Sequence, residues 1–521
     1  MVGRLTPLLL VALVAAACGD GAATTTTGRP AAVSTVPATA TSAVPETAPT
    51  PPPDPTAPPR TVPAPTTTAT TTTTLPPRAE GTVPPSSVGR PWGEVTGLTM
   101  FRGNPTRTWY GAGPVPESPG VVWRYPDSAM CGQSSVGGEA RQWCGTGWTG
   151  QPVVWERPDG VTEVIFGAYD KQVHFVDAAT GRDTRTPFAT GDIIKGSVTL
   201  DPDGYPLLYT GSRDGRLHVV ALDRAEPAEL WSLDADSVDG VWNDDWDGNP
   251  VVLDDLLIEG GENGWFFVVR LNRGYDGGQV TIAPEMLLAV PGYTDELIGR
   301  VGRNVSIENS PALYGTRVYF ANSGGRVVGL DLERVAEGDV PIVFDYWVGD
   351  DVDATIVVDA AGMLYVTVEM ERFNDRSREV GQLLRLDPYT AGDPLLWSVA
   401  IPPRGGGEGG AWATPALHDG HLYAATHPGE LLAVDIESGE VVWRDEIGWH
   451  AWSSPVVVDD TLLVATCAGT VRAYDVTDPA APAPVWEAEL GGGTCIESTP
   501  AVWKGRIYVG ARDGFFYALG E

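Results

Sequence analysis

Short apolar runs alternate with turns rich in Gly, Asp and Pro from about residue 151 to the C-terminus. Residues 414–443 show the pattern most clearly, because glycine-containing turns divide them into four such runs. Apolar runs of this length between Gly, Pro and Asp are typical of β-strands joined by tight turns. The segment is therefore predicted to form four consecutive antiparallel strands, at 415–417, 421–426, 430–435 and 440–443.

The same unit recurs eight times along the chain. Each copy has a polar first residue, a Tyr/Val-rich run, a glycine turn and a run ending near aspartate, and most copies then reach a tryptophan. A self-similar unit of about 40–50 residues with four strands indicates a β-propeller blade. We therefore predict an all-β fold, an eight-bladed β-propeller of four-stranded antiparallel blades, or seven blades if the divergent third copy is not a blade. The copies begin at Gln151, Ser197, Asn249, Ser310, Thr355, Thr414, Ser454 and Thr499.

The eighth copy ends the chain without a fourth apolar run. Far upstream, residues 121–123 (Val-Val-Trp) have the form of a fourth strand that no other strands precede. We predict that this N-terminal strand completes the last blade, which closes the ring and removes an exposed sheet edge.

The N-terminus is predicted to direct export. Residues 1–18 contain one arginine, an apolar stretch and three alanines before Cys18, the pattern of a secretory signal peptide too short for a membrane span. The residues before Cys18 resemble a bacterial lipobox, which implies lipidation of Cys18; ordinary cleavage beside an incidental cysteine is the alternative. Residues 19–90 are rich in Thr and Pro and poor in large apolar residues, so a disordered stalk is predicted there and the propeller at 91–521.

The formal net charge is −34, and the stalk contributes little of it because its acids and arginines nearly cancel. Phosphate binding needs basic stripes, so the charge argues against nucleic acid and favours cations or basic partners.

Four cysteines remain when Cys18 is set aside. They can pair in three ways in an exported protein. We favour the sequence-local disulfides, Cys131 with Cys144 and Cys467 with Cys495, over free buried thiols.

The repeats resemble the PQQ-like (quinoprotein-type) β-propeller family, whose Asp…Thr-Gly…Trp ending is matched by Asp435, Ser438-Gly439 and Trp443. Residues 101–125 resemble the lead-in segment of such proteins. The resemblance implies the propeller fold and tryptophans docked between neighbouring blades. These tryptophans are Trp231, Trp347, Trp397, Trp443 and Trp486.

The family contains both enzymes and scaffolds, so the fold alone does not decide the function. Its dehydrogenases stack pyrroloquinoline quinone over Ca²⁺ against a disulfide of adjacent cysteines, and this sequence has neither a Cys-Cys pair nor a Cys-x-x-Cys-His haem site. The quinone is therefore not expected. The plan of signal peptide, lipid-anchor cysteine and propeller is similar to the BamB-like lipoprotein branch, although the long stalk departs from it.

A candidate site comes from aligning the copies on the position of the proline. The residue one before it is always polar, whereas the residue three before it varies between copies. If the blades are alike, the second set forms a ring at one channel mouth, where carboxylates facing aromatic walls could hold a cation or cationic ligand. A solvated polar funnel is the alternative. The set is Thr149, Lys195, Asp247, Glu308, Asp353, Trp412, Trp452 and Glu497.

A second candidate overlaps the first. Asn243, Asp245, Asp247 and Asp254 approximate the spacing of a calcium loop, in which oxygen ligands at alternate positions precede a glycine turn. The alternative is an Asp/Gly turn between blades. Ca²⁺ is the only cofactor that the sequence suggests.

Hydrolytic chemistry has little support, because none of the six histidines has a metal-ligand spacing and no G-x-S-x-G elbow is present. We therefore expect an exported, membrane-anchored, monomeric propeller of the cell envelope that binds or scaffolds an envelope protein or glycan. The alternatives are a quinoprotein-type dehydrogenase using pyrroloquinoline quinone and Ca²⁺, or an envelope sensor or carbohydrate-binding module.

Overall fold

The computed structural model describes residues 80–521 except 137–138, 149 and 406. The signal peptide, Cys18, most of the stalk and Thr149 lie outside the described residues. None of the helices in the described part is long and apolar enough to cross a membrane.

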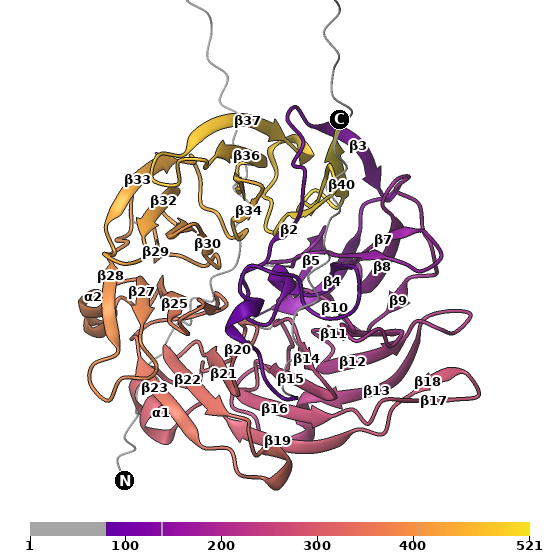
Figure 1. Ribbon diagram of the computed structural model, residues 1–521, viewed down its shortest axis with the longest axis horizontal. Helices are drawn as coiled ribbons and strands as arrows, with labels where there is room; N and C mark the ends of the chain where they lie inside the picture. Colours follow the sequence, from indigo (N-terminus) through magenta and orange to yellow (C-terminus); the bar gives the residue numbers. More distant parts are fainter. Residues whose placement is uncertain (1–79, 137–138, 149, 406) are drawn as a thin grey trace, which may run out of the picture. The chain divides into compact units, whose positions relative to one another are not determined.

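Eight blades of four antiparallel strands follow one another around a ring, as predicted (Figure 1). Blade 1 is β6–β9 (Val153–Glu156, Thr162–Gly167, Gln172–Asp177, Phe188–Ala189), and blade 2 is β10–β13 (Thr199–Leu200, Leu207–Gly211, Arg216–Ala221, Ala228–Asp234). Blade 3 is β14–β16 with β19 (Val251–Leu253, Leu256–Gly260, Trp265–Arg270, Glu285–Pro291). Blade 4 is β20–β23 (Ala312–Tyr314, Arg317–Ala321, Arg326–Asp331, Ile342–Trp347). Blades 5 to 7 are β24, β25, β27 and β28 (Val357–Val358, Leu364–Thr367, Leu383–Leu386, Leu395–Val399), β30–β33 (Ala416–His418, His421–Ala425, Glu430–Asp435, Val441–Glu446) and β34–β37 (Val456–Val458, Thr461–Ala465, Thr470–Asp475, Ala483–Glu489). Blade 8 is β38–β40 (Ala501–Trp503, Arg506–Gly510, Phe516–Gly520) with β3 (Gly120–Tyr125).

The predicted ring closure is confirmed. Strand β3 pairs antiparallel with β40, so that Val121 lies opposite Leu519 and Trp123 opposite Ala518. Two short strands extend neighbouring sheets: β1 (Gly97–Leu98) joins β6, and β2 (Gly111–Ala112) runs parallel to β38. The third copy, the most divergent in sequence, is a full blade.

Burial explains the strand pattern. The second and third strands of each blade are packed on both faces by neighbouring blades, so β11 and β31 are almost entirely buried. The outermost strands alternate between half-buried and exposed residues, as in β33, because one face meets solvent.

Tryptophans link successive blades in the way the family resemblance implies. Trp397 of blade 5 donates its indole N–H to Ile436 O of blade 6 at 2.8 Å. Its ring packs on Gly439, where a Cβ atom would lie 2.5 Å from the indole, so only glycine fits the Ser-Gly turn. Trp123 packs on Gly181 of blade 1 in the same manner.

The residues one before the proline position are here called the belt, and one kind of hydrogen bond joins six of its eight adjacent pairs. The backbone N–H of one blade donates to the side-chain hydroxyl of the next: Thr355 N to Thr414 Oγ1 and Thr414 N to Ser454 Oγ are both 3.0 Å. The same bond joins Gln151 to Ser197, Asn249 to Ser310, Ser310 to Thr355, and Ser454 to Thr499.

Two buried arginines of the lead-in segment fill the channel at the level of the belt, where Figure 1 shows the start of the described chain crossing the ring. The Arg102 guanidinium donates to Thr414 O, Pro415 O and Pro455 O at 2.7–3.1 Å. Arg107 donates to Asn249 O of the third blade and to Pro311 O of the fourth.

Several shorter elements lie outside the four-stranded blades. They are the hairpins β4–β5 (Cys131–Val136, Glu139–Cys144) and β17–β18 (Gly274–Asp276, Gln279–Thr281), the pair β26–β29 (Glu369–Met370, Gly409–Gly410), helices α1 (Asp295–Val301) and α2 (Asp375–Val380), and five 3₁₀ turns, η1–η5 (Pro85–Ser87, Phe101–Gly103, Ala235–Ser237, Val335–Glu337, Gly491–Gly493). Val83, which lies within the range predicted as the stalk, is buried and exchanges backbone hydrogen bonds with Gly315.

Candidate functional site at the channel mouth

The mouth residues precede the innermost strands, and the structure divides them into an acidic side and an aromatic side. Asp247, Glu308 and Asp353 belong to the successive blades 3 to 5, while Trp412 and Trp452 belong to blades 6 and 7. Glu497, in blade 8, is separate from both groups.

Lys195 is the centre of one acidic group. Its Nζ lies 2.5 Å from Asp247, 2.9 Å from Glu262 and 3.3 Å from Asp245. Burial would lower the pKa of Lys195, but the carboxylates of Asp247 and Glu262 raise it well above its ordinary value. The lysine therefore stays charged and occupies the position that a bound cation would take.

The carboxyls around Lys195 do not behave alike. Burial would raise the pKa of Glu262, but the charge of Lys195 and several hydrogen bonds outweigh this effect and lower the pKa to about 2. Burial raises the pKa of Asp247 well above its ordinary value and, with the Glu262 charge, raises the pKa of Asp245 to about 7. Arg213 adds a second cation 2.5 Å from Asp245.

Two of the four predicted calcium-loop residues, Asp254 and Asn243, do not lie as that prediction requires. Asp254 follows β14, at the opposite end of that strand from Asp247, and its carboxylate accepts from Gly81 N at 2.6 Å. Glu262 takes its place beside Asp245 and Asp247, with ligand oxygens within 4.8 Å of one another. Asn243 turns its amide nitrogen to Glu262, at 2.9 Å, so it offers a donor and not an oxygen ligand there.

In the described part of the chain, a second acidic group is paired with one cation, whereas the first is paired with two. Glu308, Asp351, Asp353, Glu369 and Glu371 interact electrostatically, and the cation beside them is Arg372, 3.4 Å from Asp351. Burial, together with neighbouring carboxylates, raises the pKa of Glu308 and of Glu371 to about 8, and raises the pKa of Asp353 and of Glu369 well above their ordinary values.

The carboxyl of Asp353 shares hydrogen bonds with those of Asp351 and Glu369, and three buried oxygens of this group accept none from an N–H or hydroxyl group of the described residues. They are Oδ1 of Asp351, Oδ1 of Asp353 and Oε1 of Glu369. Glu369 is only 1% exposed, so its carboxyl is shielded from bulk solvent. An entering cation or hydrogen-bond donor would complete this group.

The aromatic side is a stack of rings. Trp412 and Trp452 are 4.6 Å apart at 19°, and His427 lies 4.8 Å from Trp412. His427 and His450 are nearly parallel at 5.0 Å. Burial lowers the pKa of both histidines to about 4, so they are neutral at physiological pH. The buried Trp412 Nε1 has no hydrogen-bond partner among the described residues.

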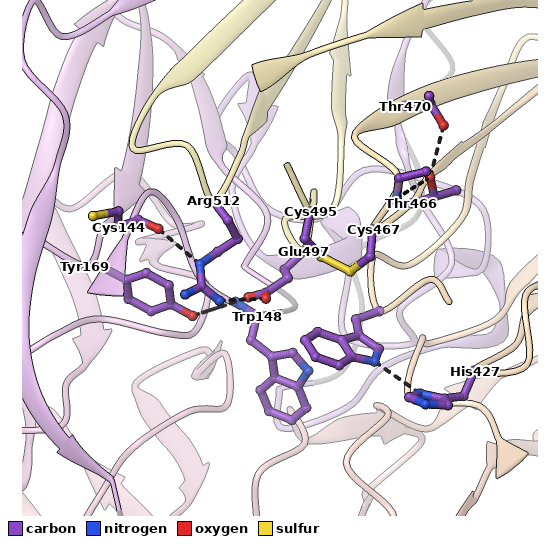
Figure 2. Close-up of a disulfide and its surroundings, with 12 residues drawn as sticks. Cys144, Trp148, Tyr169, His427, Thr466, Cys467, Thr470, Cys495, Glu497 and Arg512 are labelled. Carbon is purple, nitrogen blue, oxygen red and sulfur yellow. Dashed lines mark hydrogen bonds and ion pairs between the residues drawn. A yellow bond between two sulfur atoms is a disulfide. The ribbon is translucent and has the colours of Figure 1, made fainter. Parts of the chain in front are cut away.

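Glu497 is already neutralised. Arg512 donates to its carboxylate at 2.7 Å and Tyr169 lies at 3.5 Å, as Figure 2 shows. The two disulfides are the sequence-local pairs, Cys131–Cys144 and Cys467–Cys495. The second of these lies beside the aromatic stack, since its sulfurs lie within 4.8 Å of a ring nitrogen of His450.

Sequence reasoning missed a second mouth ring. Its members lie two residues after the end of each second strand, where the chain turns back at the mouth. Glu262, Glu369 and His427 are the members that matter most for the site. The full set is Tyr169, Arg213, Glu262, Ser323, Glu369, His427, Cys467 and Arg512.

The mouth does not fit an anionic quinone. Pyrroloquinoline quinone is a tricarboxylate, and Lys195, Arg213 and Arg372 are each already paired with carboxylates of the mouth. The cysteines of the neighbouring disulfide lie in different turns and are not adjacent in sequence.

The comparisons with known proteins agree with the fold. Residues 381–519 match the profile of a family described as outer membrane protein assembly factor BamB. BamB of Shewanella oneidensis is 32% identical over 94 residues, which cover 18% of this chain and 24% of that protein. BamB of Yersinia pestis is 24% identical over 318 residues, covering 60% of this chain and 69% of that protein.

Among solved structures, quinohemoprotein alcohol dehydrogenase ADHIIG from Pseudomonas putida HK5 has a TM-score of 0.56 at 12% identity, covering 85% of this chain and 82% of that one. This likeness shows the fold alone. Blades and ring closure define the protein as an eight-bladed β-propeller. The matched repeat and the BamB relatives support a PQQ-like β-propeller.

Proposed function

We propose that this protein is an exported, lipid-anchored propeller that acts as a monomeric binding and scaffolding module in the cell envelope. The match to BamB proteins, whose name assigns them to outer membrane protein assembly, supports the envelope setting. Lipidation of Cys18 would attach the chain to a membrane, and the Thr/Pro-rich stalk would hold the propeller away from it.

The observation that carries the proposal is the incomplete acidic side of the mouth. Asp351, Asp353 and Glu369 each present a buried oxygen that accepts no hydrogen bond from an N–H or hydroxyl group of the described residues. A cation, or a cationic group of an envelope partner, would pair these oxygens and allow the carboxyls to ionise. The rings of Trp412 and Trp452 would contribute cation–π attraction.

Calorimetric titration of the full chain with CaCl₂, and separately with argininamide, tests this site. We expect at least one of them to bind, to raise the melting temperature, and to lose its binding in the Asp353→Asn/Glu369→Gln variant. Glu497→Gln is the matched control, because Arg512 already neutralises Glu497 and binding should persist. The proposed site fails if neither probe binds or if the double variant binds as well as the wild type.

Capture of partners from envelope extract tests the scaffolding role. We expect the wild type to retain an envelope component that the double variant releases. Dye-linked alcohol oxidation after reconstitution with pyrroloquinoline quinone and Ca²⁺ would instead establish the dehydrogenase alternative and overturn the scaffold.

A further inference from the structure

The aromatic side of the mouth holds a ligand set that the proposed binding function does not use. The sulfurs of Cys467 and Cys495 and a ring nitrogen of His450 lie within 4.8 Å of one another. All three side chains are partly exposed. Among the described residues, the His450 ring nitrogens make no hydrogen bond, so a lone pair is available to a metal ion.

The surrounding contacts hold these three residues in place. Cys467 N donates to His450 O at 3.0 Å, and Arg512 N donates to Cys495 O at 2.9 Å. The His427 ring stacks on His450 at 5° and accepts a hydrogen bond from Trp452 Nε1 at 3.3 Å. Support of this kind orients ligands before a metal arrives.

We propose that reduction of the Cys467–Cys495 disulfide creates a Cys₂His site for a thiophilic divalent ion, Zn²⁺ in particular. A protein or small-molecule dithiol supplies two electrons and two protons and becomes a disulfide, while the Cys467–Cys495 bond breaks into two thiols. Each thiol releases its proton to solvent when its sulfur binds the ion, and a neutral His450 nitrogen is the third ligand.

The geometry needs only small adjustments. Zn–S bonds of about 2.3 Å and Zn–N bonds of about 2.0–2.1 Å place tetrahedral ligand atoms roughly 3.5–3.8 Å apart. The ligand atoms now lie within 4.8 Å of one another, and the two sulfurs, bonded at present, would separate to the tetrahedral distance after reduction. The fourth position is left to water, which makes this an open site and not a closed structural one.

The chain contains its own matched control. Cys131 and Cys144 lie directly opposite each other in the β4–β5 hairpin and are also partly exposed. In the described residues, no third His, Asp or Glu ligand completes a set with them at the separation found around His450. Reduction of this disulfide should create thiols without a comparable three-ligand site.

Cobalt binding to the full chain, reduced with excess dithiol and desalted without oxygen, tests the proposal. We expect the reduced protein, but not the oxidised one, to bind about one equivalent of Co²⁺ with sulfur-to-cobalt charge-transfer absorption. Zn²⁺ should displace the cobalt. Cys131→Ser/Cys144→Ser should retain the absorption, and Cys467→Ser/Cys495→Ser should abolish it.

His450→Gln supplies a variant that leaves both disulfides intact. It should weaken Co²⁺ binding by at least about 100-fold, since supporting residues alone are worth roughly 10–100-fold. The proposal is overturned if reduced wild type gives no charge-transfer band, if the band survives loss of Cys467 and Cys495, or if His450→Gln binds normally. These results do not depend on CaCl₂ or argininamide binding at Asp353, so the two proposals fail separately.

Discussion

The belt and the mouth ring are two positions apart in every repeat, yet they differ in kind. The belt position is always a small or amide polar residue, and adjacent blades repeat the same bond, such as Thr414 N to Ser454 Oγ. The mouth position is acidic in blades 3 to 5, a lysine in blade 2 and tryptophan in blades 6 and 7.

The difference separates what holds the ring together from what the ring can bind. An inter-blade hydrogen bond requires a donor and an acceptor in each copy, so uniform chemistry indicates a structural role. Where the copies diverge, the fold does not require a particular side chain. At the mouth, Asp353 and Glu369 each have a buried oxygen that accepts no hydrogen bond from an N–H or hydroxyl group of the described residues, and no belt residue has such an oxygen.

The largest effect is expected from the arginine that supports the belt. Arg107→Leu should lower the free energy of unfolding by about 3–5 kcal/mol, because several buried acceptors, including Pro311 O and Asn249 O, lose their donor together. Chemical denaturation of the full chain measures this change.

Arg216→Leu is the control, because the Arg216 side chain is half exposed and its ion pair with Asp234 is long, at 4.0 Å. It should change the unfolding free energy by less than about 1 kcal/mol. Equal losses in the two variants would contradict a structural role for the buried arginine.

Loss of a single belt hydroxyl should lower the free energy of unfolding by a smaller amount. Ser454→Ala removes the acceptor for Thr414 N and should cost about 1–2 kcal/mol of unfolding free energy. The adjacent Ser453 is equally buried, but its hydroxyl has no partner among the described residues. Ser453→Ala should therefore be neutral within about 0.5 kcal/mol. Thermal melting of both variants measures the difference. An equal loss of stability in the two variants would contradict a structural role for the belt hydrogen bond.

The repeat made the fold predictable from sequence. Turn glycines, strand periodicity and the Asp435…Trp443 frame recur, so an error in one copy is corrected by the others, and even the partnership of Val121 with the last blade followed from counting strands. The described mouth residues each precede an innermost strand, because equivalent positions in a propeller lie at equivalent depth, while their binding role stays a prediction.

The chemistry of the mouth was less predictable, because it depends on contacts between blades. Nothing near Asp247 in the sequence indicates that Lys195, from the preceding blade, occupies its site. Asp254 was misplaced because the calcium-loop spacing was applied across a strand, which carries the last residue away from the others. The second ring, including Glu369, had a signal that went unused: a fixed position after each second strand.

The smallest effect is expected in the pH dependence of the mouth. Burial, with the Glu262 charge, raises the pKa of Glu308 to about 8, so the folded state binds a proton that the unfolded state releases above pH about 4.5. The stability linked to this proton is complete at low pH and is lost as pH rises toward 8. Because Glu308 is partly exposed, Glu308→Gln should remove only about 1 kcal/mol of the decline between about pH 5 and about pH 8. Denaturation curves at the two pH values measure the decline, and exposed Glu440→Gln should leave it unchanged. Identical declines in wild type and Glu308→Gln would mean that the mouth carboxyl titrates normally, and that its contrast with the belt is one of sequence alone.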